Sequence, residues 1–331
     1  MTQAADVLPC HILAPPDVFA AVEPLFLPEP GTRPPACPHT GGRCHQQLDT
    51  DLDLLRQAAT GMHPRALRAP EDTRRRTRYR WVVGHHAAFA VWQCLRRSLE
   101  EAEDGPGPPE PAIHTAARLY DVYSVLFLYT GGCPPRRYAE TVRADMMARH
   151  PAFSGEWARD YQAIPELTKR VRALHPEATT APLAEAARLN HRVHMAVARK
   201  LVPDGASLLQ EAGRRPGKAP SEAERELYDD YFAVHREVVC ESAFAAQLVR
   251  RLAQVLCDVC VYGLTEADSP PAGFGPPHTG SVEAFEYKAG ALLRALAEDL
   301  AATARPSAAH PNVPVRAGTV PLQQGASRCP Q

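Results

Sequence analysis

The sequence predicts an all-α protein built as one helical domain, and three observations lead to that fold class. From residue 48 onward, apolar residues recur at steps of three and four, which is the period of one helix face. The chain shows neither an alternating apolar and polar pattern of useful strand length nor an internal repeat. Its 331 residues are 45% hydrophobic, enough to bury one large core. We therefore expect an irregular N-terminal segment (1–47), a helical domain (48–304) and a loose C-terminal tail (305–331).

Three helices are expected in the first half of the helical domain, each with one apolar face. The first face holds Trp81, His85, Ala88, Trp92, Leu95 and Leu99, and that helix ends in the Gly- and Pro-rich stretch 105–109. The second face holds Ile113, Ala117, Tyr120, Ser124 and Phe127 and ends at the loop 130–135. The third holds Tyr138, Val142 and Met146 and ends near Pro151. Gly and Pro set these boundaries because neither favours a helix interior.

The second half of the domain is expected to add three more helical segments. One follows Pro182 and ends at Pro203, with an apolar face made of Leu183, Ala187, Asn190, His194, Val197 and Leu201. Another opens with a capping box at Ser221-Glu222-Ala223-Glu224 and continues without Pro or Gly until Gly263, which predicts one long helix. The last follows Ser281 and carries Phe285, Ala289, Leu292, Leu296 and Leu300.

The overall charge argues for no particular partner, and the composition is not that of a nucleic-acid-binding or membrane protein. Lys and Arg number 37 and Asp and Glu number 38, so the chain is close to neutral. No apolar run approaches the length of a membrane-spanning helix, and the N-terminus lacks a basic region followed by an apolar one. The protein is therefore expected in the cytoplasm, with its nine cysteines as reduced thiols. The Arg-rich run 74–80 is then interpreted as a solvated helix start or an oligomer contact.

Two groups of cysteines invite a metal interpretation that the sequence supports poorly. Cys37, His39, Cys44 and His45 lie close together, but among prolines and without a matching second half, so a loop with incidental thiols is favoured over zinc. The pair of thiols at 257 and 260 falls late in a predicted helix with no second pair, which argues against a zinc or redox role.

His85 and His86 follow Gly84 on the first helix, where burying an imidazole costs free energy unless its ring nitrogens find partners. His85 shares a seam with two tryptophans, so a core histidine bonded to a carbonyl oxygen is favoured. His86 lies about 100° further around the helix, at the edge of the core, where a cavity wall would be. Its polar tip is placed to act on a ligand, although an edge histidine with satisfied hydrogen bonds fits the spacing equally well.

His191 and His194 lie three residues apart on a predicted helix and could chelate one metal ion. The carboxylates that zincins and di-iron bundles place near such a pair are missing from this stretch. A single imidazole on an otherwise apolar stripe is typical of a proximal haem ligand. In that interpretation the apolar wall facing the porphyrin consists of Leu189, Val193, Val197 and Ala198.

The loop from Thr130 to Tyr138 joins two predicted helices and is a candidate anion clamp. Its glycines leave backbone amides accessible, and the helix that follows offers a positive N-terminus. Arg136, Arg137 and Arg143 are the cationic candidates. A solvated, Arg-rich helix start is favoured over the clamp, because the glycine pattern matches neither a Walker nor a Rossmann fingerprint.

Three motifs in order carry a resemblance to a known family. Arg80-Trp81-Val82-Val83-Gly84-His85-His86 is followed by Leu128-Tyr129-Thr130-Gly131 with Tyr138 and Arg143, and then by His194 with Ser207-Leu208-Leu209. The chain resembles the histidine-ligated, haem-dependent L-tyrosine hydroxylases of actinobacterial antibiotic biosynthesis, distant relatives of tryptophan 2,3-dioxygenase. The resemblance implies a fold of the tryptophan 2,3-dioxygenase type, with haem between helices.

The resemblance also implies roles for individual residues. His194 matches the proximal ligand of the haem iron, and His86 matches the distal histidine that touches the substrate phenol. Tyr138 and Arg143 fall in the stretch expected near the amino-acid end of the substrate. Asn190, one turn before His194, is our own candidate for a polar group in the pocket. Relatives that hydroxylate 3-methyltyrosine bind haem covalently through a cysteine that corresponds here to Ala198, so non-covalent haem b is expected, with Val197 and Ala198 beside it.

The activity implied by the resemblance is a peroxygenase reaction. L-Tyrosine and hydrogen peroxide would give L-DOPA and water, the first step toward a 4-alkylproline antibiotic unit. Relatives imply a homo-oligomer, a dimer or larger. A haem dioxygenase acting on tryptophan or another indole, and a non-catalytic haem-binding helical protein, remain as alternatives.

Overall fold

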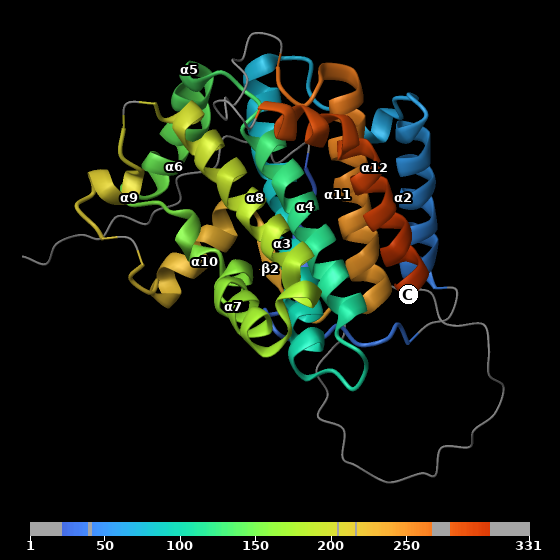
Figure 1. Cartoon of the computed structure of the whole chain (residues 1–331). Coiled ribbons are helices and arrows are strands. Elements are labelled where there is room, and N and C mark those ends of the chain that lie inside the picture. The colour runs from blue at the N-terminus through green and yellow to red at the C-terminus, as the bar shows by residue number, and fades with distance from the viewer. Residues whose placement is uncertain (1–21, 39–41, 204, 216, 267–278, 305–331) are drawn as a thin grey trace, which may run out of the picture.

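Long helices packed side by side form the body of the protein, which confirms the predicted all-α, single-domain fold class (Figure 1). The computed structural model describes residues 22–38, 42–203, 205–215, 217–266 and 279–304, the last range with side chains from 288 onward. His39 and the expected tail 305–331 lie outside this description. Within it, α4 (Glu110–Thr130) packs between α3 (Thr73–Asp104) and α8 (Glu177–Leu201). On the other side of α3, α11 (Glu241–Tyr262) packs against α2 (Arg43–Ala59) and α12 (Thr279–Ala304).

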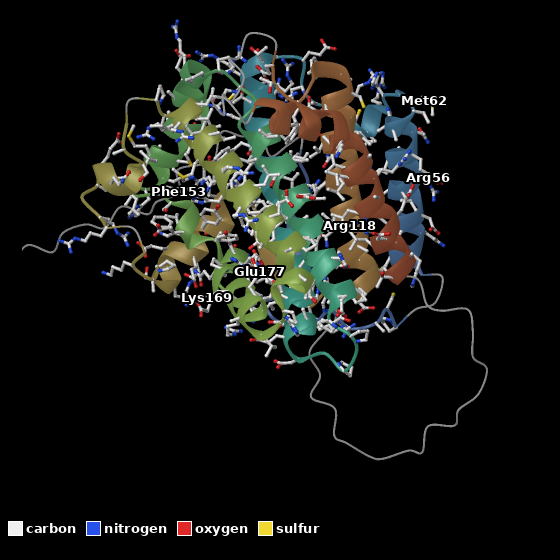
Figure 2. The ribbon with its side chains drawn as sticks, viewed as in Figure 1. Arg56, Met62, Arg118, Phe153, Lys169 and Glu177 are labelled. Atoms are coloured by element: carbon white, nitrogen blue, oxygen red, sulfur yellow. The ribbon has the colours of Figure 1, made fainter. Side chains whose placement is uncertain are left out.

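Shorter elements complete the described part of the fold. They are η1 (Arg65–Leu67), α5 (Pro135–Tyr138), the π-helical turn η2 (Ala139–Arg143), α6 (Ala144–Arg149), η3 (Gly155–Trp157), η4 (Arg159–Tyr161), α7 (Ile164–Leu174), α9 (Leu208–Glu211) and α10 (Glu222–Tyr231). Charged side chains such as Arg56 on α2 and Lys169 on α7 point outward from this body (Figure 2). Among the described helices, none has the length and hydropathy needed to cross a bilayer.

Most helix boundaries agree with the sequence prediction because local residues set them. Asp72 caps α3 by accepting a hydrogen bond from the Arg75 amide at 2.8 Å, and the helix ends at Gly105 as expected. The capping box at Ser221 and Glu224 is present at the start of α10. Two starts differ from expectation: α2 begins at Arg43, and α8 already begins at Glu177, with Pro182 inside the helix.

The predicted long helix from Ser221 to Gly263 is wrong, because the chain breaks at residues 232–240. Ala233 has a φ of 50°, and β2 (Val234–Arg236) follows it. This strand pairs in parallel with β1 (Leu25–Leu27), and the Leu25 amide bonds the Ala233 carbonyl oxygen at 3.1 Å. A pairing partner about two hundred residues away supplies hydrogen bonds that replace those of the helix, and nothing local marks it.

Gly84 allows α3 and α4 to approach closely just before the histidine pair. A Cβ atom at this position would lie 2.3 Å from Thr130 Cγ2 and 3.1 Å from Tyr129 Cδ1. Real side chains do not tolerate the first separation, so the crossing depends on glycine. The conspicuous Gly84-His85-His86 sequence therefore combines a helix crossing with two imidazoles.

Part of the Arg-rich start of α3 forms ion pairs with other segments of the chain. Arg74 pairs with Glu140 at 2.5 Å and Arg78 with Asp145 at 2.8 Å. Arg80 is 1% exposed and pairs with Asp258 of α11 at 2.8 Å. Arg78 and Arg80 are thus paired within the fold, whereas Arg74 is 61% exposed and Arg75 is exposed, as expected for a solvated helix start.

Candidate functional site

His86 is enclosed in the core and held by the backbone of a distant segment. Its side chain is 0% exposed, and its Nε2 lies 2.5 Å from the carbonyl oxygen of Phe232. A carbonyl oxygen only accepts, so Nε2–H is the donor and Nδ1 carries the lone pair. Nδ1 is buried and has no hydrogen-bond partner in the described part of the chain. Burial, followed by the nearby charge of Arg251, lowers the pKa of His86 well below its ordinary value, which keeps the ring neutral.

His85 occupies a different environment, although it is the next residue. Its Nδ1 donates to the Trp81 carbonyl oxygen one turn earlier at 2.7 Å, which leaves the lone pair on Nε2. The ring stacks on Phe232 at 4.5 Å with an angle of 17° between the planes. Burial lowers the pKa of His85 to about 4, so this ring is neutral as well.

The burial order that helix periodicity predicted for these two residues is wrong. His86 is the fully buried member, whereas His85 is half-buried. The segment after α10 explains the reversal, because Phe232 brings its carbonyl oxygen over His86 and its ring against His85. Phe232 lies 146 positions from His86 in sequence, and no pattern in the sequence marked it as a partner.

His194 lies on α8 in an open but protein-lined position. The residue is exposed, yet the surrounding protein desolvates the imidazole and lowers its pKa below the ordinary value, with a smaller effect from His191. The His194 ring is nearly parallel to that of Phe127, with 4.7 Å between the centroids and a 7° angle. The neighbouring Met195 is 40% exposed, so apolar surface adjoins the imidazole.

A continuous set of aromatic contacts joins the histidines of α3 to His194 of α8. The rings in order are His85, Phe89, Trp92, Tyr123, Phe127 and His194. Neighbouring ring centroids in this set lie 4.4 to 5.9 Å apart. The two histidine-bearing helices, about a hundred residues apart in sequence, therefore border one aromatic cluster.

The other expected site residues lie around the same helices but already have partners. Asn190 is buried, and its amide donates to Ser124 Oγ at 3.1 Å, which ties α8 to α4. Tyr138 is buried with its ring edge toward Trp81 at 5.8 Å, and burial raises its pKa to about 12. Arg143, in the π-helical turn, donates to the Ala206 carbonyl oxygen at 3.1 Å and pairs with Glu211 at 2.8 Å.

The remaining candidates from the sequence lie on α8 and in the stretch from Thr130 to Tyr138. Val197 is buried where a Cβ on Gly131 would touch it at 2.3 Å, so α8 contacts the loop after α4 closely. Ala198 is half-buried, and His191 is exposed. In the candidate clamp, Arg136 pairs with Glu140 at 2.7 Å and Arg137 pairs with the buried Glu266. The arginines of the loop are thus charge-compensated within the chain.

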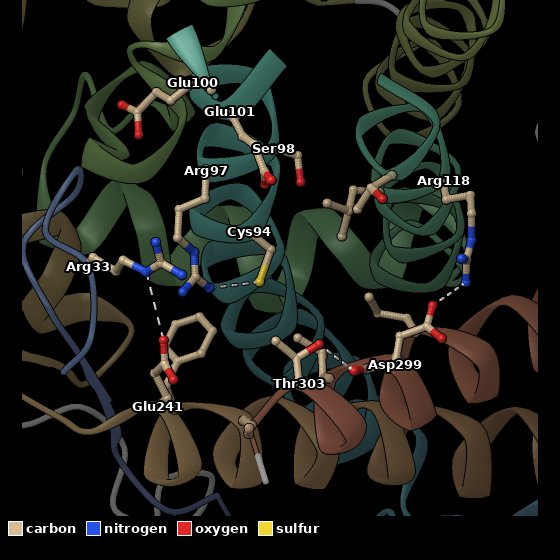
Figure 3. Close-up of a pocket in the computed structure, with 18 of the residues that line it drawn as sticks. Arg33, Cys94, Arg97, Ser98, Glu100, Glu101, Arg118, Glu241, Asp299 and Thr303 are labelled. Atoms are coloured by element: carbon tan, nitrogen blue, oxygen red, sulfur yellow. Dashed lines mark hydrogen bonds and ion pairs between the residues drawn. The ribbon is translucent and has the colours of Figure 1, made fainter. Parts of the chain in front are cut away.

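A cavity of about 650 Å³ lies away from these histidines, between α3, α4, α11 and α12 (Figure 3). Its charged lining residues largely face one another: Arg118 pairs with Asp299 at 2.7 Å, and Arg33 lies 3.8 Å from Glu241. Arg97 donates to Cys94 Sγ at 3.2 Å. No expected site residue lines this cavity. We place the candidate site at the histidines, because neutral imidazoles and unpartnered polar atoms lie there.

The residues around the histidines fit a planar, apolar cofactor with a metal that accepts nitrogen ligands. His194 is neutral and accessible, as an axial ligand of haem must be. Trp81 Nε1 and His86 Nδ1 are buried without partners among the described residues, which is costly unless a bound molecule completes their hydrogen bonds. The aromatic cluster supplies the apolar surroundings that a porphyrin requires.

Comparison with known families finds a match to part of the chain. Residues 44–188 match the family model described as SfmD 3-methyl-L-tyrosine peroxygenase. The matched range contains both histidines of α3 and all of α4, and it ends inside α8 before His194. A search of curated proteins finds no match to the chain. The matched range is less than half of the chain.

Proposed function

We propose that this protein is a haem-dependent peroxygenase that converts L-tyrosine and hydrogen peroxide into L-DOPA and water. The observation that carries the proposal is that neutral histidines on α3 and α8 border one aromatic cluster, in a chain whose residues 44–188 match a peroxygenase family model. The order of the histidine, loop and second histidine motifs supports tyrosine as the substrate. The product would enter the synthesis of a 4-alkylproline antibiotic unit.

His194 is proposed as the axial ligand of a non-covalent haem b. The haem would supply the oxidising power derived from peroxide, and the protein would supply position and proton control. Phe127 stacks on the His194 ring and restricts its orientation. Val197 and Ala198, on the following turn of α8, would contact the porphyrin, and an alanine at 198 offers no thiol for a covalent link.

His86 is proposed as the base that accepts the phenol proton of the substrate. Its Nε2 is held by the Phe232 carbonyl oxygen, so Nδ1 is the available acceptor, and its lowered pKa keeps that lone pair free of a proton at neutral pH. His85 is a second candidate for this role, because it is the less enclosed of the two and carries its lone pair on Nε2.

Polar groups on α5, η2 and α8 are proposed to position the amino-acid part of tyrosine. Arg143 would bind the carboxylate by sharing its guanidinium with Glu211, since five N–H donors allow more than one acceptor. Tyr138 would contact the same end, and Asn190 would orient α8 through Ser124. Correct placement of the ring carbon next to the phenol is worth several orders of magnitude in rate.

The direct test uses purified protein loaded with haem. A Soret band that shifts when L-tyrosine is added, and formation of L-DOPA with peroxide, would support the proposal. L-Tyrosine and 3-methyl-L-tyrosine should be compared in parallel, and tryptophan with dioxygen tests the dioxygenase alternative by product mass. Protein that shows no Soret band after haem supplementation would contradict both enzyme interpretations. Extraction with acidified organic solvent should remove the haem, and size-exclusion chromatography with light scattering should show a dimer or larger oligomer.

Substitutions separate the histidine roles. His194→Ala should lose bound haem, while His191→Ala, a matched change one turn away, should retain it. His86→Ala should keep haem but lose most turnover, about 10²-fold or more for loss of a proton acceptor. If His86→Ala turns over at the native rate and His85→Ala does not, the base is His85. If His194→Ala keeps a histidine-ligated spectrum, the axial assignment is wrong.

A further inference from the structure

Three cysteine sulfurs from distant parts of the chain meet beside the N-termini of two helices. The ligand atoms of Cys37, Cys44 and Cys240 all lie within 4.8 Å of one another. Cys37 lies in the segment that precedes α2, and Cys44 is in the first turn of α2. Cys240 is the N-cap residue of α11. The sequence shows only the first two as neighbours, and the fold adds the third.

Two contacts outside the thiols hold the same three segments together. The Glu241 amide donates to the Pro35 carbonyl oxygen at 2.8 Å, which joins the start of α11 to the segment before α2. Ser242 Oγ and His45 Nε2 lie 3.0 Å apart, which joins α11 to α2. The Nδ1 atom of His45 is buried without a partner in the described residues. The sulfurs are therefore brought together by an ordered junction.

Two helix N-termini adjoin this junction. Helix N-termini carry partial positive charge and lower the free energy of an adjacent anion, and here the N-termini of α2 and α11 converge. Three cysteine sulfurs at such distances form the kind of ligand set that a thiophilic metal ion prefers, and metal binding would release the thiol protons.

We propose that Cys37, Cys44 and Cys240 bind one zinc ion as three thiolates. Two sulfurs bound tetrahedrally to one zinc, each about 2.3 Å from it, are about 3.8 Å apart. The cluster therefore needs only a small contraction to reach that geometry. A nitrogen or oxygen ligand would complete the four-coordinate shell. The role of the ion is structural, because it would cross-link the segment that follows β1 to the first turns of α2 and α11. This zinc site is separate from the proposed haem.

Metal analysis of the haem-loaded protein, purified without chelators, tests the proposal. Inductively coupled plasma mass spectrometry should find about one zinc ion per chain, as expected for a closed structural site. Iron is counted separately in the same sample. Cys240→Ser should lower the zinc content at least about fivefold, since removal of a thiolate ligand weakens binding strongly. Cys257→Ser, a buried cysteine of α11 outside the cluster, is the matched control and should retain zinc.

Two further measurements keep the test decisive if Cys240→Ser folds poorly. Cys37→Ser lies in a loop and should fold, yet it should lose zinc to the same degree. Cobalt added to zinc-depleted protein should produce the strong near-ultraviolet bands of thiolate coordination. Zinc below about 0.1 per chain without cobalt bands, or zinc unaffected by either cysteine substitution, would overturn the proposal, given the tight binding expected of such a site. An intact mass that shows a disulfide among these three cysteines would overturn it as well.

Discussion

Removing the carboxylate of Asp258 should destabilise the protein strongly, because it leaves a buried charge without its counter-ion. Asp258 accepts two hydrogen bonds from Arg80, at 2.8 and 3.2 Å, and one from the Tyr129 hydroxyl at 2.8 Å. These bonds join α11, α3 and α4. Burial opposes the charge of Arg80, but Asp258 and Tyr129 outweigh it, so the pKa of Arg80 is raised. After Asp258→Ala, the hydrogen-bond acceptors left to Arg80 among the described residues would be the carbonyl oxygens of Leu264 and Gly263.

The size of the effect follows from the burial of the pair. Arg80 is 1% and Asp258 0% exposed at the side chain, so solvent cannot replace the lost partner. Breaking one side of such a pair costs about 3–5 kcal/mol in the free energy of unfolding. Asp258→Asn keeps one acceptor and should cost less. The double variant Arg80→Met/Asp258→Ala removes both charges and should be more stable than Asp258→Ala alone.

Urea unfolding followed by far-UV circular dichroism measures these differences. Asp299→Ala breaks the exposed pair with Arg118, whose side chains are 59% and 50% exposed, and serves as the control with little expected change. The reasoning is refuted if Asp258→Ala costs less than about 1 kcal/mol, the level of an exposed pair. It is also refuted if the double variant is less stable than the single one, because a buried uncompensated charge would then not be the cause.

Two further predictions concern the histidine-bearing part of α3. The pKa of His85 is lowered from 6.5 to about 4 in the folded protein. As the pH falls, the unfolded chain therefore takes up a proton at this residue at a higher pH than the folded chain does. The free energy of unfolding should then fall between about pH 6.5 and pH 4, by at most about 3 kcal/mol. Urea titrations across this range should show a smaller decline in His85→Gln, and parallel declines would contradict the assignment. Gly84→Ala places a Cβ 2.3 Å from Thr130 Cγ2 and should cost about 1–3 kcal/mol. Thr130→Ser removes that methyl group and should recover stability in the double variant, whereas additive losses would show that the crossing is not the cause.

Helix boundaries were predictable because the residues that set them are local. Asp72 caps α3 through the amide three residues later, and Ser221 and Glu224 form their capping box within one turn. The break before α11 was not predictable, because residues 232–240 contain neither Pro nor Gly. That break depends on pairing with β1, more than two hundred residues away.

The histidine site, like the helix boundaries, was predictable only in part. The sequence placed His86 and His194 on helices with apolar faces, and the structure joins their helices through one aromatic cluster. Periodicity alone misassigned the burial of His85 and His86. Which flank of a helix is covered depends on the elements packed against it, and here Phe232 covers His86 from a segment that the sequence assigned to a helix.

The pattern of apolar residues alone therefore established the all-α class, the order of the main helices and two helices bearing histidines. That information is local, since helix period, caps and breakers act within a few residues of one another. Tertiary packing decided which imidazole is enclosed, where Arg80 finds its counter-ion and that Cys240 joins Cys37 and Cys44. Those outcomes require segments far apart in the chain to meet, and burial and charge pairing act on the distances that the fold creates.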